Sequence, residues 1–132
     1  MNRNRFVTIL VCLVFYAAGA AAQVPFTDTE TGSGFIKGME LYEKEKYPAA
    51  IKFFDSYIGD SESTSLITLA EAEYYRSLCA LHLFNPDAEY RMITFIRTHP
   101  ESPRINEAYL ALGDYFYQNK NYRKAVSYYE TV

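Results

Sequence analysis

The sequence predicts an all-α protein made of antiparallel helical hairpins. Large apolar residues recur at intervals of three and four between Tyr109 and Phe116, which is the spacing of one face of a helix. The same spacing returns between Tyr122 and Tyr129, after the polar residues 118–121. Two helices joined by so short a connection fold back on each other. We therefore expect a hairpin in this part of the chain.

Small residues interrupt the apolar face of both helices. Gly113 lies in the first helix and Ala125 in the second, where larger side chains would have filled the face. Glycine destabilises a helix by about 1 kcal/mol relative to alanine, so its position needs a structural reason. We expect the backbones of the two helices to approach closely at these positions.

The same pattern occurs 75 positions earlier in the chain, in residues 34–58. The matching small and aromatic positions are Gly38 with Gly113, Ala50 with Ala125, and Phe54 with Tyr129. We predict helices over residues 35–44 and 47–58. The interval corresponds to two periods of about 37 residues, which leaves room for one further repeat between them.

A more divergent hairpin is expected over residues 66–100. The polar stretch 59–65 begins with a glycine, which is typical of the end of a helix. Apolar spacing predicts helices over 66–84 and 88–98, and Asn85 or Asp87 is expected to cap the second one.

Only the second half of this middle hairpin follows the spacing of the other two. Ala88, Phe95 and Pro100 keep that spacing, whereas Arg76 takes the position of the small residue in the first helix. We interpret residues 66–100 as a degenerate repeat.

The order of large, small and aromatic residues in the last hairpin resembles the tetratricopeptide repeat. The residues that carry this resemblance are Tyr109, Leu112, Gly113, Phe116, Tyr122, Ala125 and Tyr129. Tyr109 stands where the family usually has Trp, and Phe116 where it usually has Tyr. The first repeat departs further, with Gly34 and Lys37 at positions where an aromatic residue and a leucine are usual.

The resemblance implies a fold and a mode of action. Family members stack their hairpins into a right-handed solenoid, which here would hold about three repeats over 34–58, 66–100 and 104–132, the last incomplete. Their first helices line a concave face that binds extended peptides or helices of partner proteins. On this face the resemblance places Phe35 and Met39, together with the candidate partner-binding residues Tyr42, Leu110, Asp114, Tyr117 and Gln118.

A narrower resemblance concerns the stretch 95–103, Phe-Ile-Arg-Thr-His-Pro-Glu-Ser-Pro. It is similar to a sequence motif found in bacterial envelope repeat proteins, including outer-membrane-assembly lipoproteins and periplasmic cell-division coordinators. This resemblance implies a place in the cell envelope, in the periplasm or in association with the outer membrane through a partner.

The N-terminus has the features of a cleavable signal peptide over residues 1–22. Two arginines precede an apolar run, and Ala20-Ala21-Ala22 offers a cleavage site before Gln23. A membrane anchor is the alternative, although the run is only marginally long enough. We reject lipidation of Cys12, because Val11 is too large for the usual recognition sequence. Residues 23–33 are interpreted as a flexible tether.

Charge and cysteine content argue against a nucleic-acid-binding protein, a disulfide-stabilised domain and a cysteine-dependent enzyme. The net charge is −3, and without Arg3 and Arg5 it is −5, from 11 basic and 16 acidic residues. No basic patch suited to nucleic acid is visible. Without Cys12, Cys79 is the only cysteine, so no internal disulfide is expected. Its apolar neighbours favour a buried residue over a catalytic thiol paired with His82.

No catalytic motif, metal site or cofactor site is predicted. His82 and His99 are far apart in the sequence and lack suitable partners. We therefore expect a scaffold that is not an enzyme and that binds a protein or peptide.

Two alternatives remain open: a glycan-binding envelope protein that uses its tyrosine-rich surface, and the non-catalytic front end of a larger enzyme. Tyr122 and Val126 extend the apolar surface of the last helix beyond one face. We expect this surface to continue into a longer solenoid, and the chain alone to self-associate.

Overall fold

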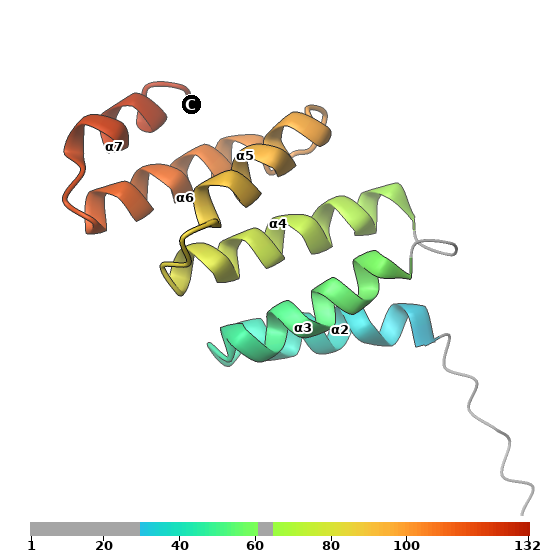
Figure 1. Ribbon diagram of the computed structural model, residues 1–132. Coiled ribbons are helices and arrows are strands. Elements are labelled where there is room, and N and C mark those ends of the chain that lie inside the picture. The colour runs from blue at the N-terminus through green and yellow to red at the C-terminus, as the bar shows by residue number, and fades with distance from the viewer. Residues whose placement is uncertain (1–29, 61–64) are drawn as a thin grey trace, which may run out of the picture.

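A computed structural model describes residues 30–60 and 65–132, and these residues are helical throughout apart from short connections. The helices are α2 (Glu30–Glu43), α3 (Tyr47–Gly59), α4 (Leu66–His82), α5 (Ala88–Thr98), α6 (Ile105–Gln118) and α7 (Tyr122–Tyr129) (Figure 1). The described ranges contain no strand, so the all-α prediction is confirmed. The predicted signal peptide and most of the predicted tether lie outside the described residues.

The helices pack mainly on their neighbours in the sequence. α2 packs on α3, α4 on α5, and α6 on α7, while α3 contacts α4 and α5 contacts α6. The first helices of the three pairs also meet, because α4 contacts both α2 and α6. The pairs consequently follow one another along the molecule, with α2–α3 and α7 at opposite ends (Figure 1). No helix in the described ranges is long and apolar enough to cross a membrane.

Two clusters of buried side chains form the core, and α4 contributes to both of them. The first joins α3 to α4 through Phe54, Tyr57 and Cys79. The second joins α4, α5 and α6 through residues such as Met92 and Leu112. α4 is thus the central element of the described residues.

The first helix of each pair ends in the same turn. Glu45, Phe84 and Lys120 adopt left-handed backbone conformations with φ of 55°, 53° and 60°. Each donates its N–H to a carbonyl three residues back, and the next N–H reaches a carbonyl five residues back, at 2.8–3.0 Å in all three turns. This is the Schellman arrangement of helix ends. The turns are 39 and 36 residues apart, on either side of the expected period of about 37.

Aromatic rings fill the space over the two central glycines. A Cβ atom added to Gly38 would lie 2.6 Å from the Cε1 atom of Phe54, and one added to Gly113 would overlap the ring of Tyr129. The nearest atoms therefore belong to side chains, and the expected contact between backbones is wrong at these positions. Glycine leaves the space that allows the second helix to place a ring directly on the first.

The middle hairpin has a different register from the one expected. In each turn, one carbonyl accepts the hydrogen bond from the N–H five residues later. The residue three positions before this carbonyl is Gly38 in the first hairpin, Ser77 in the middle one and Gly113 in the last. Ser77 is 1% exposed and its hydroxyl donates to the carbonyl of Glu73 at 2.8 Å. Arg76 points instead to Asp55 of α3, at 3.1 Å. Placing Arg76 at the small-residue position was wrong, because the small residue of the middle hairpin, Ser77, precedes Ala88 by 11 positions, whereas the glycines of the other two hairpins precede the matching alanines by 12.

Helix ends differ from the predictions in three places. α2 begins at Glu30, inside the predicted tether. α4 ends at His82, because the backbone reverses its handedness at Phe84. Asp87 is the residue before α5, but its side chain does not cap the helix and pairs with Arg91 at 2.6 Å.

The capping role of Asn85 is also different from the one predicted. Asn85 meets the first turn of α5 through its backbone carbonyl, which accepts from the N–H of Ala88 at 3.1 Å. A side-chain cap that the sequence analysis missed occurs at α7. There the Oδ1 atom of Asn121 accepts from the N–H of Lys124 at 3.3 Å.

Candidate functional site

The first helices of the three pairs line one hollow of about 290 Å³. α2 contributes one residue, and α4, α6 and the turn after α4 contribute the others. The lining residues are Tyr42, Tyr74, Leu78, Leu81, His82, Phe84, Ala111, Asp114, Tyr115 and Gln118. We call this feature the α2/α4/α6 hollow.

Three of the five candidate partner-binding residues lie in this hollow. Tyr42, Asp114 and Gln118 line it, although α2 and α6 are far apart in the sequence. Leu110 and Tyr117 are exposed on α6 and do not line it, and the ring of Tyr117 lies against Tyr122 at 5.4 Å. The structure therefore divides the predicted surface into two parts.

The other two residues expected on this face belong to the packing of the first hairpin. Phe35 is half-buried, and its ring lies 6.0 Å from that of Phe54 and 5.6 Å from that of Tyr57. Met39 is half-buried against the same cluster. Neither of them lines the hollow.

Aromatic rings form two walls of the hollow. On one side, Phe84 is 47% exposed and its ring stacks on Tyr115, with centroids 5.6 Å apart. On the other side, the ring of Tyr42 contacts Tyr75 at 5.1 Å and His82 at 6.2 Å. Burial raises the pKa of Tyr42, so this phenol remains neutral at physiological pH. The Phe84, Tyr115 and Tyr42 rings of these walls thus offer uncharged surfaces.

Asp114 supplies the negative charge of the hollow. Its Oδ1 atom accepts a hydrogen bond from the hydroxyl of Tyr129 at 2.7 Å, which joins α6 to α7. This hydrogen bond raises the pKa of Tyr129 to about 12. The contacts described for Asp114 use only Oδ1, so Oδ2 is available for a ligand.

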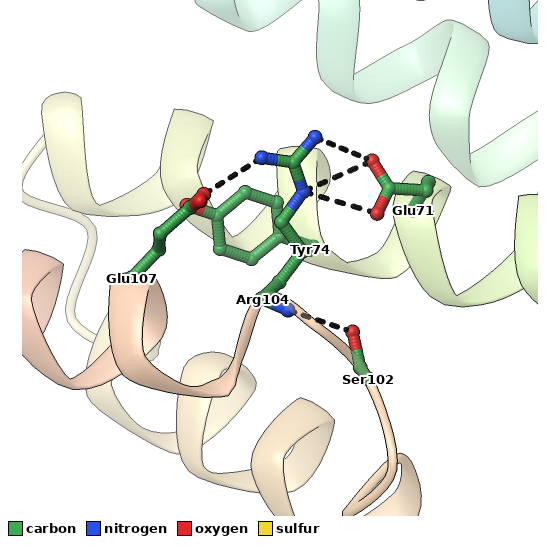
Figure 2. Close-up of polar contacts among 5 residues, drawn as sticks. All are labelled: Glu71, Tyr74, Ser102, Arg104 and Glu107. Atoms are coloured by element: carbon green, nitrogen blue, oxygen red, sulfur yellow. Dashed lines mark hydrogen bonds and ion pairs between the residues drawn. The ribbon is translucent and has the colours of Figure 1, made fainter. Parts of the chain in front are cut away.

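A cluster centred on Arg104 holds α4 and α6 together beside the hollow (Figure 2). The Nε and Nη2 atoms of Arg104 donate to the carboxylate of Glu71 at 3.1 Å, and Nη1 donates to Glu107 at 2.8 Å. The guanidinium carbon lies 5.6 Å from the ring centroid of Tyr74, whose hydroxyl donates to Glu107 at 3.3 Å. The carboxylates raise the pKa of Arg104 further above its ordinary value.

This cluster positions the site and is not itself a binding site. Tyr74 belongs both to the Arg104 cluster and to the wall of the hollow. The cluster adds polar contacts between α4 and the start of α6 to the apolar packing that these helices share. The sequence shows the spacing of Arg104 and Glu107, but nothing in it indicates that Glu71, 33 positions away, completes the set.

Phe84 and Tyr115 are further residues of the hollow that the sequence analysis did not single out. Phe84 looked like the last apolar residue of a helix, and its exposure follows from the left-handed backbone of the turn. The one available signal is the Asn-Pro pair that directly follows it. Tyr115 gave no signal, because it lies in a run of aromatic residues on α6.

A second hollow of similar volume, about 290 Å³, lies between the start of α4 and the connection from α5 to α6. Exposed Leu66 and Ile67 line it together with the prolines of the stretch 95–103. Two of its polar side chains are engaged in the fold: Arg104 holds Glu71, and His99 Nε2 lies 2.8 Å from Glu73. None of the five candidate partner-binding residues lines this second hollow, whereas three of them line the α2/α4/α6 hollow.

Cys79 is a core residue. It is completely buried, and burial raises the pKa of its thiol to about 12. The thiol is therefore protonated at neutral pH and a poor nucleophile. Within the residues that the structure describes, no group of three or more His, Cys, Asp or Glu side chains lies close enough to hold a metal ion.

Comparison of the chain with models of known protein families, with curated proteins and with solved structures found no match. The functional interpretation therefore rests on the sequence and on the geometry of the described residues.

Proposed function

We propose that this chain is an exported repeat protein, similar to tetratricopeptide repeat proteins, whose hairpins stack as a right-handed solenoid. The observation that supports this most directly is the recurrence of one hydrogen-bonded turn at Glu45, Phe84 and Lys120. A turn that repeats at intervals of 39 and 36 residues is typical of repeat architectures.

The proposed function is to bind an extended segment of a partner protein in the α2/α4/α6 hollow. Support comes from the three helices that line it, each of which is the first helix of its pair. Rigid aromatic side chains are common at protein interfaces, because they contribute contact area at little cost in conformational entropy. We propose no enzymatic activity and no cofactor.

Site-specific photocrosslinking in cells can test this function. A photoreactive phenylalanine derivative replaces Gln118, which lines the hollow, and in a matched variant it replaces Lys52, which is exposed on α3. The proposal predicts a discrete adduct at position 118 that is absent at position 52 and is lost when Phe84→Ala is added. Identical adducts at both positions, or an adduct unaffected by Phe84→Ala, would contradict it.

Export to the envelope is a separate part of the proposal. It rests on the signal-peptide features of residues 1–22 and on the resemblance of residues 95–103 to envelope repeat proteins. The intact mass of protein purified from the envelope tests it, since cleavage after Ala22 leaves Gln23 as the first residue. A species that begins at Met1, or that carries lipid on Cys12, would argue against this processing.

A glycan is the second candidate ligand. The observation that favours it is the exposed ring of Phe84 beside the carboxylate of Asp114 and the amide of Gln118, because sugars bind by stacking on rings and by hydrogen bonding to such groups. A glycan array separates the two candidates. Saturable binding of a neutral oligosaccharide that Phe84→Ala abolishes would favour the glycan over the protein segment.

A further inference from the structure

The described residues twice combine an aromatic ring, a carboxylate and a cation. Arg104 lies over Tyr74 and donates to Glu71 and Glu107. At the other position, the Nζ atom of Lys124 lies 4.4 Å from the ring centroid of Phe116 and 2.8 Å from Glu89. In both places the ring face and the carboxylate attract the same cation.

The α2/α4/α6 hollow contains the same two elements with no cation of this chain. Phe84 and Tyr115 provide stacked rings, and Asp114 provides the carboxylate. Among the described residues that line the hollow there is no lysine or arginine. The only other titratable side chain that suits a cationic role is His82, whose ring stacks on Tyr47 with centroids 4.5 Å apart.

We propose that the hollow receives an arginine side chain of the partner segment, with the guanidinium stacked on the Phe84–Tyr115 wall and paired with Asp114. This inference rests on the proposed binding function of the hollow and names the chemistry of its ligand. A planar guanidinium suits both contacts, because it stacks on ring faces and donates two parallel hydrogen bonds to a carboxylate.

Charge around the hollow supports a basic ligand. Arg104 is shared between Glu71 and Glu107, so that cluster carries a net negative charge beside Tyr74, and Asp114 adds a second one. A carboxylate entering the hollow would lose its hydration and meet no lysine or arginine among the lining residues. Peptide tails that end in acidic residues and a free carboxylate should therefore not bind.

The size of the hollow also fits this ligand. About 290 Å³ lies at the lower limit of ligand sites, which suits one long side chain and its flanking backbone rather than a whole folded element. The partner segment should accordingly be extended where it crosses the hollow.

A set of blocked pentapeptides with one variable central residue can test the charge preference. Calorimetry and NMR titration of the full chain would compare arginine with citrulline, which has nearly the same shape without the charge, and with glutamate. We expect the arginine peptide to bind at least tenfold more tightly than the citrulline peptide, with shifts at Phe84 and Tyr115. Equal binding of the arginine and citrulline peptides, or shifts confined to other residues, would overturn the inference.

Two variants link the preference to the hollow. Asp114→Asn keeps a hydrogen-bond acceptor for Tyr129 and should reduce arginine binding to the level of citrulline. A control variant, Asp87→Asn, makes the same change at the residue before α5 and should leave arginine binding unchanged. Phe84→Leu, at an exposed position, should weaken arginine binding independently of Asp114. Undiminished binding by Asp114→Asn or by Phe84→Leu would refute the proposed contacts.

The two proposals can fail separately. If position 118 still crosslinks to a partner while the peptides show no preference for arginine, the binding function stands and the inferred ligand is wrong. If arginine peptides bind in the hollow but no partner crosslinks to it in cells, the chemistry of the hollow is right and its proposed use is wrong.

Discussion

The first and last hairpins contain the same packing motif but are embedded to different extents. In each, a ring of the second helix covers a glycine of the first: Phe54 covers Gly38, and Tyr129 covers Gly113. Phe54 is completely buried, whereas Tyr129 is half-buried and its hydroxyl reaches Asp114 at the surface. The same pattern of residues therefore occupies a closed position in one hairpin and an open one in the other.

Neighbouring helices account for this difference. α3 packs on α2 with one face and on α4 with the other, which buries Ala50, Phe54 and Tyr57. α7 packs on α6 and buries only Ala125, while Tyr122 and Val126 are 55% and 51% exposed. The repeat pattern thus specifies the contacts within a hairpin, whereas the stability of the hairpin depends on what covers its second helix.

The largest difference is expected when the two rings are removed. Phe54→Ala leaves a cavity in a closed core and should lower the free energy of unfolding by about 3–5 kcal/mol. Tyr129→Ala should lower it by less than half as much, because water can fill the space and only one exposed hydrogen bond is lost. Urea unfolding of both variants measures this. Equal losses would mean that α7 is as much part of the core as α3.

Added volume at the buried alanines should affect both hairpins in the same way. Ala50 and Ala125 are almost completely buried, so Ala50→Leu and Ala125→Leu should each cost about 1–3 kcal/mol. Ser127 is exposed on α7, and Ser127→Leu should change stability by less than about 0.5 kcal/mol. Similar urea midpoints for Ala125→Leu and Ser127→Leu would contradict the orientation of α7.

Replacing the two glycines with alanine should also affect the stability of the two hairpins differently. Each Gly→Ala change gains about 1 kcal/mol of helix propensity, and the new methyl group meets a ring. Phe54 cannot move in its closed position, so Gly38→Ala should be destabilising by about 1–2 kcal/mol overall. Tyr129 can swing outward, so Gly113→Ala should be close to neutral. Thermal unfolding of both variants measures this difference. A larger loss of stability in Gly113→Ala than in Gly38→Ala would contradict it, and would mean that the closer overlap of the new methyl group at Gly113 decides the effect.

The smallest effect is expected from pH at the attachment of α7. Burial alone would raise the pKa of Glu89, but hydrogen bonds from Lys124 and Tyr128 more than offset it, and the pKa is lowered. The unfolded chain then binds this proton more readily, so the stabilisation is present above about pH 4.3 and is lost as the pH falls through the folded pKa.

Hydrogen exchange at pH 6 and pH 3.5 can detect this loss. α7 should lose protection before α3 on acidification, by less than about 1 kcal/mol because these groups are partly exposed. The variant Glu89→Gln, in which α7 lacks the ion pair at both pH values, should remove most of this pH dependence. A full pH dependence in Glu89→Gln would assign the effect to another group.

Most of the fold could be predicted from local spacing. The apolar period placed α5 within its observed bounds and α3 within one residue of them, because an amphipathic helix is specified by residues that are neighbours in the sequence. The predicted register of the middle hairpin was wrong because register depends on the number of residues between the two helices' small positions: Ser77 and Ala88 are 11 residues apart, one fewer than the glycine and alanine of either other hairpin.

The candidate site was predictable only in part. Helix periodicity and the family resemblance put Tyr42, Asp114 and Gln118 on one face, but periodicity does not tell which turns of a helix face a neighbour. The exposure of Phe84 follows from a left-handed residue that the sequence does not mark with a glycine. Arg104 and Glu71 meet only because α4 and α6 pack side by side.

Packing between neighbours in the sequence also has a kinetic consequence. The main contacts join helices that are one or two steps apart along the chain, so few long loops must close before native contacts form. Helical proteins with such local contacts fold within microseconds to milliseconds. α4 contacts both core clusters, so a folding nucleus that contains α4 and one neighbouring helix can recruit the remaining helices in either direction along the chain.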